Sequence, residues 1–352
     1  MESQNDPLVE ERFPVLTNSE FELLLNSWKK VNIMVIGDMI ADRYVEGRIS
    51  RISREAPVLV LEHAGETIVP GGAANVVHNV AALGGQIWAV GIIGADFSGA
   101  ELVKILDAKG ADTAGLIVDA DRSTITKTRI MAGGQATVRQ QIVRIDRETK
   151  QPLSDDIAAK QLAYVEEYLK DVQAVILSDY GNGSITPAIR DSVIERCRKL
   201  DIPCIVDSRY DIFAFKGAAV IKQNEAEAAA ALGLEKIDEV NLKQAGLELC
   251  SQLAARSLLL TRGAEGMTVF EESGAVTHIP VANVSEVYDV SGAGDTVVAV
   301  MALALAGGLS YMEAARLANI AAGVVVRKFG TATASTLELA EAWKQYTAGG
   351  RI

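Results

Sequence analysis

The residues best suited to chemistry lie in one short stretch, Tyr-Asp-Val-Ser-Gly-Ala-Gly-Asp-Thr at positions 288–296. Gly292 and Gly294 come just before a run of apolar residues that predicts a buried helix, so their backbone N–H groups are expected at its positive end. Such a helix start is a binding site for anions, including phosphate. Asp295, in the first turn, is close enough to accept a proton from a hydroxyl that attacks a phosphorus atom held there.

This turn therefore indicates phosphoryl transfer to an alcohol. A structural alternative is equally open at this point: the loop leads into a helix, and its early aspartate only complements the helix dipole. The chain contains neither GxxxxGK[ST] nor a complete GxGxxG. The usual fingerprints of P-loop and dinucleotide-binding proteins are therefore missing, and a phosphoryl transferase would need another construction.

A second pair of residues fits the same chemistry. Asn224 and Glu227 are expected one helical turn apart on the same face, where both can orient water on a Mg²⁺ ion that bridges phosphates. As a motif Asn-x-x-Glu is weak, and a plain helix start with an acid near the dipole is its common meaning. The motif supports a magnesium site only in combination with other motifs in the chain.

Composition limits the functions to consider. The 352 residues are 49% hydrophobic and 23% charged, which is typical of a globular protein with a large core. A net charge of −12 argues against nucleic acid as a partner. The three cysteines and three histidines show no metal or redox spacing. No apolar run is long enough to span a membrane and no signal peptide opens the chain, so we expect a cytoplasmic protein without a membrane partner.

The order of apolar segments predicts an α/β fold with a doubly wound, mostly parallel sheet and helices on both faces. A buried strand is expected at 31–36, a strand and helix at 87–93 and 99–109, and strict alternation of strands and helices follows from Leu153. Ligands bind at the carboxyl edge of such sheets. The polar residues expected there are Asp38, Asp42, Arg43, Asp179, Asp207, Asn224, Glu227, Thr261, Arg262 and Gly263.

Two segments, about 43–69 and 124–145, alternate like β-hairpins and contain no helix between their strands. We expect them to join in one small β lid over the sheet. Unpaired lid edges can be covered by a second subunit, so a homodimer through the lid is expected. Arg48, Arg51 and Arg54 lie between the strands of the first segment as a solvated face or as ligands of an anionic substrate.

The N-terminal part is expected to stand apart from the main domain. Residues 1–30 would form a leader up to residue 16 and a short helix from Thr17 to Lys30, in which Ser19 and Glu22 have the spacing of a capping box. Residues 31–352 would form the main domain. Within that domain, the stretch Pro70–Asn75 opens a helix of small residues that runs to about Leu83. Its two glycines allow a ligand to approach the backbone closely.

The motifs taken together resemble those of the PfkB, or ribokinase-like, carbohydrate kinases over residues 31–345. The stretches that carry this resemblance are Gly71-Gly72-Ala73-Ala74-Asn75, Asn224-x-x-Glu227, Thr261-Arg262-Gly263 and Asp289-Val290-Ser291-Gly292-Ala293-Gly294-Asp295-Thr296. Their order and joint presence are far more specific than any one of them. The resemblance implies a ribokinase-like fold, ATP and Mg²⁺ as cofactors, and a sugar or sugar phosphate as substrate; a monovalent cation is left open.

By this resemblance, Asp295 would be the catalytic base and Gly292, Ala293 and Gly294 the anion hole. The residues implied for substrate binding are Asp42, Arg43, Gly71, Gly72 and Asn75. Those implied for the nucleotide are Asn224, Glu227, Thr261 and Gly263, of which Asn224 and Glu227 would also hold Mg²⁺, through water.

Within the family, the chain is most similar to kinases that phosphorylate the anomeric hydroxyl of D-glycero-β-D-manno-heptose 7-phosphate. The stretches 37–44, 51–58, 177–180 and 318–330 carry this likeness. A chain of this length leaves no room for the nucleotidyltransferase often fused to that kinase, so a stand-alone enzyme is expected. A phosphorylated acceptor would explain basic residues near the lid, and the candidates are Arg48, Arg51, Arg54, Lys127 and Arg129.

Two stretches depart from the family pattern. Asp207-Ser208-Arg209 replaces an Asp-Pro-Lys type sequence, and Lys222-Gln223 precedes Asn224 where Thr-Pro is usual. Both are expected near the phosphates or the sugar. They leave the acceptor open between this heptose phosphate, another sugar phosphate and a nucleoside, with a non-catalytic sensor as the alternative from another class.

Overall fold

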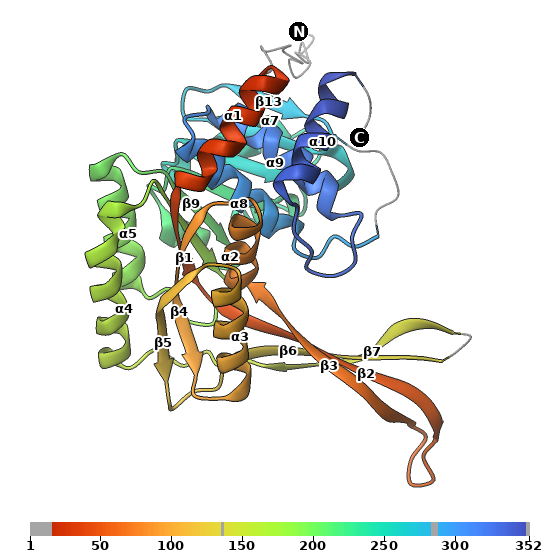
Figure 1. The fold of residues 1–352 in the computed structure, drawn as a ribbon. Helices are drawn as coiled ribbons and strands as arrows, with labels where there is room; N and C mark the ends of the chain where they lie inside the picture. Colours follow the sequence, from red (N-terminus) through yellow and green to blue (C-terminus); the bar gives the residue numbers. More distant parts are fainter. Residues whose placement is uncertain (1–15, 135–136, 283–287, 350–352) are drawn as a thin grey trace.

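The computed structural model describes residues 16–134, 137–282 and 288–349, and its centre is a nine-stranded sheet (Figure 1). The strand order is β13-β12-β11-β10-β9-β8-β1-β4-β5, and all neighbours are parallel except β11–β12 and β12–β13. In chain order the strands are β1 (Asn32–Gly37), β4 (Gln86–Gly94), β5 (Asp112–Asp119), β8 (Ala174–Asp179), β9 (Cys204–Ser208), β10 (Val220–Asn224), β11 (Ser257–Thr261), β12 (Met267–Glu271) and β13 (Val276–Ile279).

Helices cover both faces of this sheet. One face carries α1 (Asn18–Ser27), α2 (Ala73–Ala82), α3 (Phe97–Ala108), α8 (Ala293–Ala306), α9 (Tyr311–Val325) and α10 (Thr336–Thr347). The other carries α4 (Asp155–Tyr168), α5 (Pro187–Leu200), α6 (Glu225–Ala231) and α7 (Leu242–Leu253). Short 3₁₀ turns lie at Trp28–Lys30, Leu169–Asp171, Ile212–Phe215 and Gly263–Glu265.

The apolar pattern of the strands explains this two-faced cover. In β1, Ile33 and Val35 pack in the core on the α8 face, while Met34 and Ile36 pack in the core on the α4 face. Successive side chains of a strand point to opposite faces, so a strand that is apolar throughout must be buried on both. The α/β fold expected from the sequence is thereby confirmed.

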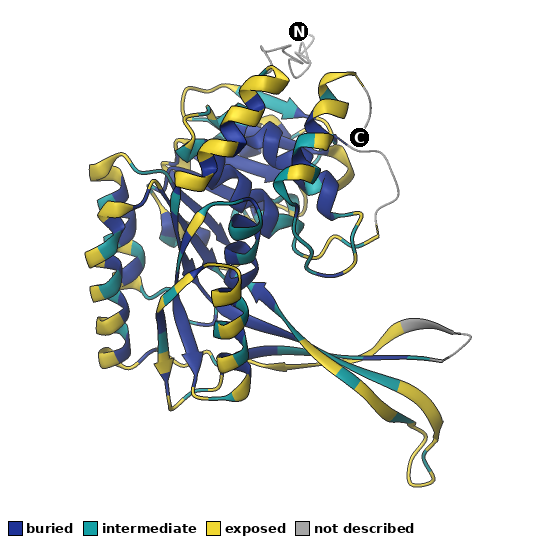
Figure 2. Ribbon diagram, viewed as in Figure 1, coloured by how far each residue is buried: buried dark blue, intermediate teal, exposed yellow. Residues whose placement is uncertain are grey.

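The lid is a second sheet of four strands in the order β3-β2-β6-β7. Its strands are β2 (Met39–Ile52), β3 (Leu59–Gly72), β6 (Ile125–Gly134) and β7 (Thr137–Arg147). They run through the two segments from which a lid was expected. The lid projects from the main sheet as a long arm, and its far half is mostly exposed while its base is buried (Figures 1 and 2).

Two sequence expectations about local structure were wrong. β5 was not expected, although it forms the edge of the main sheet beside β4. The capping box of α1 joins Thr17 and Glu20, not Ser19 and Glu22: Glu20 N donates to Thr17 Oγ1 at 3.2 Å, and Thr17 N donates to Glu20 Oε2 at 2.7 Å. Only the capping pair was misplaced, because the helix itself was expected from Thr17, which is its N-cap.

The first helix is anchored on the last one. Phe21 of α1 stacks on Trp343 of α10 with ring centroids 4.4 Å apart, and both side chains are buried. Residues 1–15 of the expected leader lie outside the described residues. In the described part of the chain, no helix combines the length and the apolar character needed to cross a membrane.

Candidate active site

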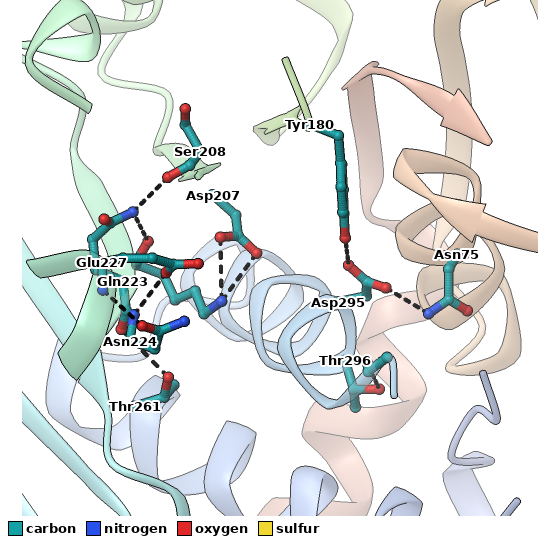
Figure 3. Close-up of polar contacts among 12 residues, drawn as sticks. Asn75, Tyr180, Asp207, Ser208, Gln223, Asn224, Glu227, Thr261, Asp295 and Thr296 are labelled. Atoms are coloured by element: carbon teal, nitrogen blue, oxygen red, sulfur yellow. Dashed lines mark hydrogen bonds and ion pairs between the residues drawn. The ribbon is translucent and has the colours of Figure 1, made fainter. Parts of the chain in front are cut away.

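Asp295 lies in the first turn of α8, and its carboxylate is held by donors from two other elements (Figure 3). Asn75 Nδ2 of α2 donates to Oδ2 at 2.7 Å, and Tyr180 Oη donates to Oδ1 at 2.9 Å. Burial raises the pKa of Asp295 to about 6, because loss of water disfavours the charged form more than these donors favour it. A carboxylate that titrates near neutrality can accept a proton from a hydroxyl.

The turn before Asp295 requires glycine. Gly292 is the N-cap of α8 and adopts a left-handed conformation with φ of +79°. A Cβ at this position would also lie 2.7 Å from Asn75 Nδ2, the group that donates to the Asp295 carboxylate. Only glycine meets both conditions without strain.

The expected anion hole at residues 292–294 lies at the positive end of α8. The Ala293 N–H donates to the Val290 carbonyl at 3.2 Å, so this amide already has a partner. A helix provides no internal acceptors for the amides of its first turn. The N–H groups of Gly292 and Gly294 are therefore the donors best placed for an anion in front of Asp295.

A chain of hydrogen bonds fixes Asn75 beneath the carboxylate. Asn79, one turn further along α2, donates from Nδ2 to the Asn75 carbonyl at 2.8 Å. Thr296 Oγ1 of α8 donates in turn to Asn79 Oδ1 at 2.7 Å. All of these side chains are buried. The two helices that carry Asn75 and Asp295 are thus locked together where the sequence predicted one sugar contact and one base.

Asn224 and Glu227 form a capping box at the start of α6. Glu227 N donates to Asn224 Oδ1 at 2.8 Å, and Asn224 N donates to Glu227 Oε2 at 2.9 Å. The same two residues line a cavity of about 820 Å³ together with Thr261, Gly263 and residues 292–295. The structural role weighed for this motif is therefore present, and the residues also face the space next to Asp295.

A buried ion pair that the sequence analysis did not assign lies in the same cavity. Lys222 Nζ is 3.2 and 3.1 Å from the two carboxylate oxygens of Asp207. Burial alone lowers the pKa of Lys222, but the charges of Asp207 and Glu227 outweigh it and raise that pKa. A Cβ on Gly294 would lie 3.0 Å from Lys222 Nζ. A permanent positive charge thus stands beside the start of α8.

The expected sugar contacts gather where the lid leaves the main sheet. Asp42 of β2 is buried, and Arg129 Nη1 of β6 donates to its Oδ1 at 2.8 Å. A Cβ on Gly71 would lie 2.6 Å from Asp42 Oδ2, so glycine lets this carboxylate lie against β3. Gly72, with φ of +53°, is the N-cap of α2, three residues before Asn75.

Arg43 is not brought to this group. Its guanidinium pairs with Glu66 at 2.5 Å across β2 and β3. Because neighbouring residues of a strand point to opposite faces, Arg43 lies on the face of the lid away from Asp42. Its position follows from β2, which begins at Met39 and continues through the segment expected from about residue 43.

The carboxylate of Asp38, another polar residue at the sheet edge, binds backbone N–H groups and does not line the cavity. Its carboxylate accepts hydrogen bonds from the N–H groups of Tyr180 at 2.8 Å, Asn182 at 3.1 Å and Ser184 at 3.1 Å. Asp38 thereby fixes the loop after β8, from which Tyr180 reaches Asp295. Sequence reasoning quoted Tyr180 only within a stretch of likeness, because a lone tyrosine after a strand has no motif of its own.

With this geometry in view, comparison with known proteins identifies the family. The sequence profile described as "pfkB family carbohydrate kinase" matches residues 30–338. The chain belongs to this family. Among curated relatives, "Bifunctional protein HldE" of Geobacter sulfurreducens is 41% identical over 310 residues, which are 88% of this chain and 62% of the relative. The protein of the same name from Azorhizobium caulinodans is 41% identical over 318 residues, 90% of this chain and 65% of the relative.

The chain thus spans less than two thirds of the length of these relatives. Solved structures agree on the fold. Phosphofructokinase-2 from Escherichia coli in complex with substrates and products superposes with a TM-score of 0.72 at 19% identity, covering 90% of this chain and 99% of that one. Ribokinase from Arabidopsis thaliana, complexed with ribose and ATP, gives 0.68 at 20% identity, covering 89% and 98%. The ribokinase-like architecture expected from the sequence is confirmed.

Proposed function

We propose that this carbohydrate kinase transfers the γ-phosphoryl group of ATP to a hydroxyl of a sugar phosphate, with Asp295 as the base. The observation that carries the proposal is the placement of Asp295. Its carboxylate, with a pKa near 6, stands at the positive end of α8 and is aligned by Asn75 and Tyr180. A base and an anion site in one helical turn are the two parts that phosphoryl transfer to an alcohol requires of the protein.

In this mechanism the sugar hydroxyl approaches Asp295 from the side of Asp42 and gives its proton to the carboxylate. Negative charge grows on the transferring group, and the N–H groups of Gly292 and Gly294 stabilise it. The Lys222 ammonium, which lies beside Gly294, stabilises the same charge. None of these groups has to move far, because hydrogen bonds and the Asp207 pair already hold them.

The donors around the cavity suit Mg²⁺ held chiefly by water and phosphate. Glu227 uses one carboxylate oxygen in the capping box, and the other is left for a water molecule or an ion. The described residues contain no cluster of three or more His, Cys, Asp or Glu side chains that would bind a metal by themselves. Mg²⁺ prefers sites that provide few protein oxygens and leave several positions to water. When bound with ATP, the ion would neutralise phosphate charge.

For the acceptor, we propose the anomeric hydroxyl of D-glycero-β-D-manno-heptose 7-phosphate. The resemblance of residues 37–44, 51–58, 177–180 and 318–330 to kinases of that sugar supports this substrate, as does about 40% identity to proteins named HldE. The departures at Asp207-Ser208-Arg209 and Lys222-Gln223 surround the reaction centre. They make a different phosphorylated sugar the main competing acceptor.

The test is a coupled assay of ADP release with MgATP and a panel of acceptors, in K⁺ and in Na⁺. The panel comprises the heptose 7-phosphate, other sugar phosphates, free sugars and nucleosides. Selective turnover of the heptose phosphate is the expected result. Selective turnover of another acceptor would replace the substrate but keep the mechanism, and no turnover on any of them would favour a sensor of sugar or nucleotide.

We further propose a cytoplasmic homodimer that forms through the lid. The face of the lid that carries Arg43 also exposes apolar side chains: Ile145, in register with Arg43 through Thr128, is 55% exposed, and Val143, two residues before it on the same face, is 44% exposed. Exposed apolar residues on a projecting sheet are stabilised when a second copy covers them. Size-exclusion chromatography with light scattering on wild type and Ile145→Lys tests this. The wild type should elute as a dimer and the variant as a monomer. A monomeric wild type would contradict the proposal.

A further inference from the structure

Two cations meet at the ring of Tyr180. Lys127 Nζ of β6 lies 5.3 Å from the ring centroid, and the Arg209 guanidinium, at the end of β9, lies 4.7 Å from it. The two charges are therefore no more than 10 Å apart, the sum of these distances. Tyr180 is the residue whose hydroxyl reaches Asp295, so this pair of cations flanks the reaction centre.

Carboxylates attract both cations only from a distance. Among the residues that the structure describes, Lys127 and Arg209 make no ion pair with a carboxylate. Several of the nearby acids are already engaged: Asp42 pairs with Arg129, Asp207 pairs with Lys222, and Asp146 pairs with Arg144 through two hydrogen bonds.

The surroundings of Lys127 disfavour its charge. Lys127 is partly buried, and its pKa is lowered by that burial and by the positive charge of Arg144, with Arg209 contributing in the same direction. Two like charges within 10 Å of each other repel, and an anion bound between them offsets the repulsion.

The position of the pair relates it to the acceptor and not only to the nucleotide. Lys127 is in register with Asp42 across β2 and β6, so both side chains lie on the same face of the lid. Arg209 lines the cavity next to Asp295 and is accessible to solvent. An anion bound by both would lie between the lid and the end of β9, beside the sugar that Asp42 faces.

We propose that Lys127 and Arg209 together bind a phosphate group carried by the acceptor sugar. This inference rests on the proposed function and makes it more specific. A phosphate has enough oxygens to accept hydrogen bonds from an ammonium and a guanidinium at once, each at about 2.8 Å. The site then selects phosphorylated acceptors and sets the direction of the sugar: its phosphate lies beside the Tyr180 ring, and its reacting hydroxyl lies at Asp295.

The inference changes the assignment of basic residues on the lid. Arg48, Arg51 and Arg54 are exposed on its outer half and at its tip, which project from the main sheet (Figures 1 and 2). Arg129 is committed to Asp42. Of the candidates named from the sequence, Lys127 is thus the one retained, and Arg209, from a stretch that departs from the family pattern, is added.

The experiment compares Lys127→Gln, Arg209→Gln and the double variant with wild type. Each single change should raise the KM for a sugar phosphate by about tenfold or more, since a charge-assisted hydrogen bond contributes at least about 1.5 kcal/mol. The KM for MgATP and the turnover of unphosphorylated sugars should stay within about twofold. Arg190→Gln is the control, because the Arg190 guanidinium also lies over a ring, that of Phe215 at 5.9 Å, but on α5.

A higher KM for MgATP with an unchanged acceptor KM would overturn the inference and assign Arg209 to the nucleotide. Equal losses for phosphorylated and free sugars would overturn it as well. Calorimetric binding of sugar phosphates to enzyme loaded with Mg²⁺ and a non-hydrolysable ATP analogue separates this inference from the proposed function. Weaker binding in the variants would support the phosphate site even if wild type showed no turnover, and unchanged binding would refute it.

Discussion

Removal of one hydroxyl should change the pH dependence of the reaction. Tyr180→Phe keeps the aromatic ring near Lys127 and Arg209 but deletes the 2.9 Å hydrogen bond to Asp295 Oδ1. Burial raises the pKa of Tyr180 well above its ordinary value, so its hydroxyl is a donor at every working pH. A donor stabilises the ionised carboxylate and lowers its pKa. Its loss should therefore raise the pKa of Asp295 above about 6.

The size of this shift follows from the strength of one hydrogen bond to a charged group. A contribution of about 1 to 1.5 kcal/mol corresponds to a shift of about one pH unit, and water that enters the open cavity reduces it. The acid limb of kcat/KM, near pH 6 in wild type, should move up by about 0.5 to 1 unit in Tyr180→Phe, with activity above pH 8 reduced by less than about tenfold. Coincident acid limbs for the two enzymes would refute this account of Asp295.

Three further changes test other parts of the site. Asp295→Asn should be more stable to urea than wild type at pH 8, by up to about 3 kcal/mol, but not at pH 4. Between pH 3.8 and about 6, the Asp295 carboxyl keeps its proton only in the folded state, so wild type loses stability as the pH rises through this range. A stability difference that does not depend on pH would contradict this. Glu227→Gln preserves the capping box, so thermal melting should hardly change while half-saturation by Mg²⁺ rises severalfold; an unchanged Mg²⁺ titration would exclude Glu227 from that role. Gly292→Ala should lower kcat at least tenfold by displacing Asn75, with Gly308→Ala as the control at a left-handed glycine with open space around it.

Much of the fold could be predicted because short stretches of the sequence carry the pattern of its strands and helices. In β1 and β8 the apolar runs 33–36 and 174–177 pack alternately into the two cores, which only a sheet covered on both faces accommodates. β5 escaped because it is an edge strand: Asp112 and Ala114 are exposed while Gly115 and Leu116 are buried, so neither an alternating nor a continuous apolar pattern results.

The residues of the candidate site also fall into two groups, one that sequence patterns predict and one that they do not. Residues whose function needs glycine or a fixed spacing, such as Gly292 and the Asn224–Glu227 pair, can be found in sequence, because backbone geometry constrains them. Tyr180 and Lys222 reach the site through side chains from strands far apart in the chain, and only the folded sheet brings them to Asp295. Local sequence patterns therefore do not predict that these side chains come together.

The central claim is that Asp295 accepts the proton while other groups hold the substrates. The most direct measurement is a single-turnover experiment with radiolabelled ATP and the preferred acceptor on Asp295→Asn, with calorimetric titration of both ligands on the same protein. The account predicts a rate of phosphoryl transfer at least about a thousandfold below wild type, with both dissociation constants within about threefold. Transfer at a rate near that of wild type would contradict the assignment of the base and with it the mechanism.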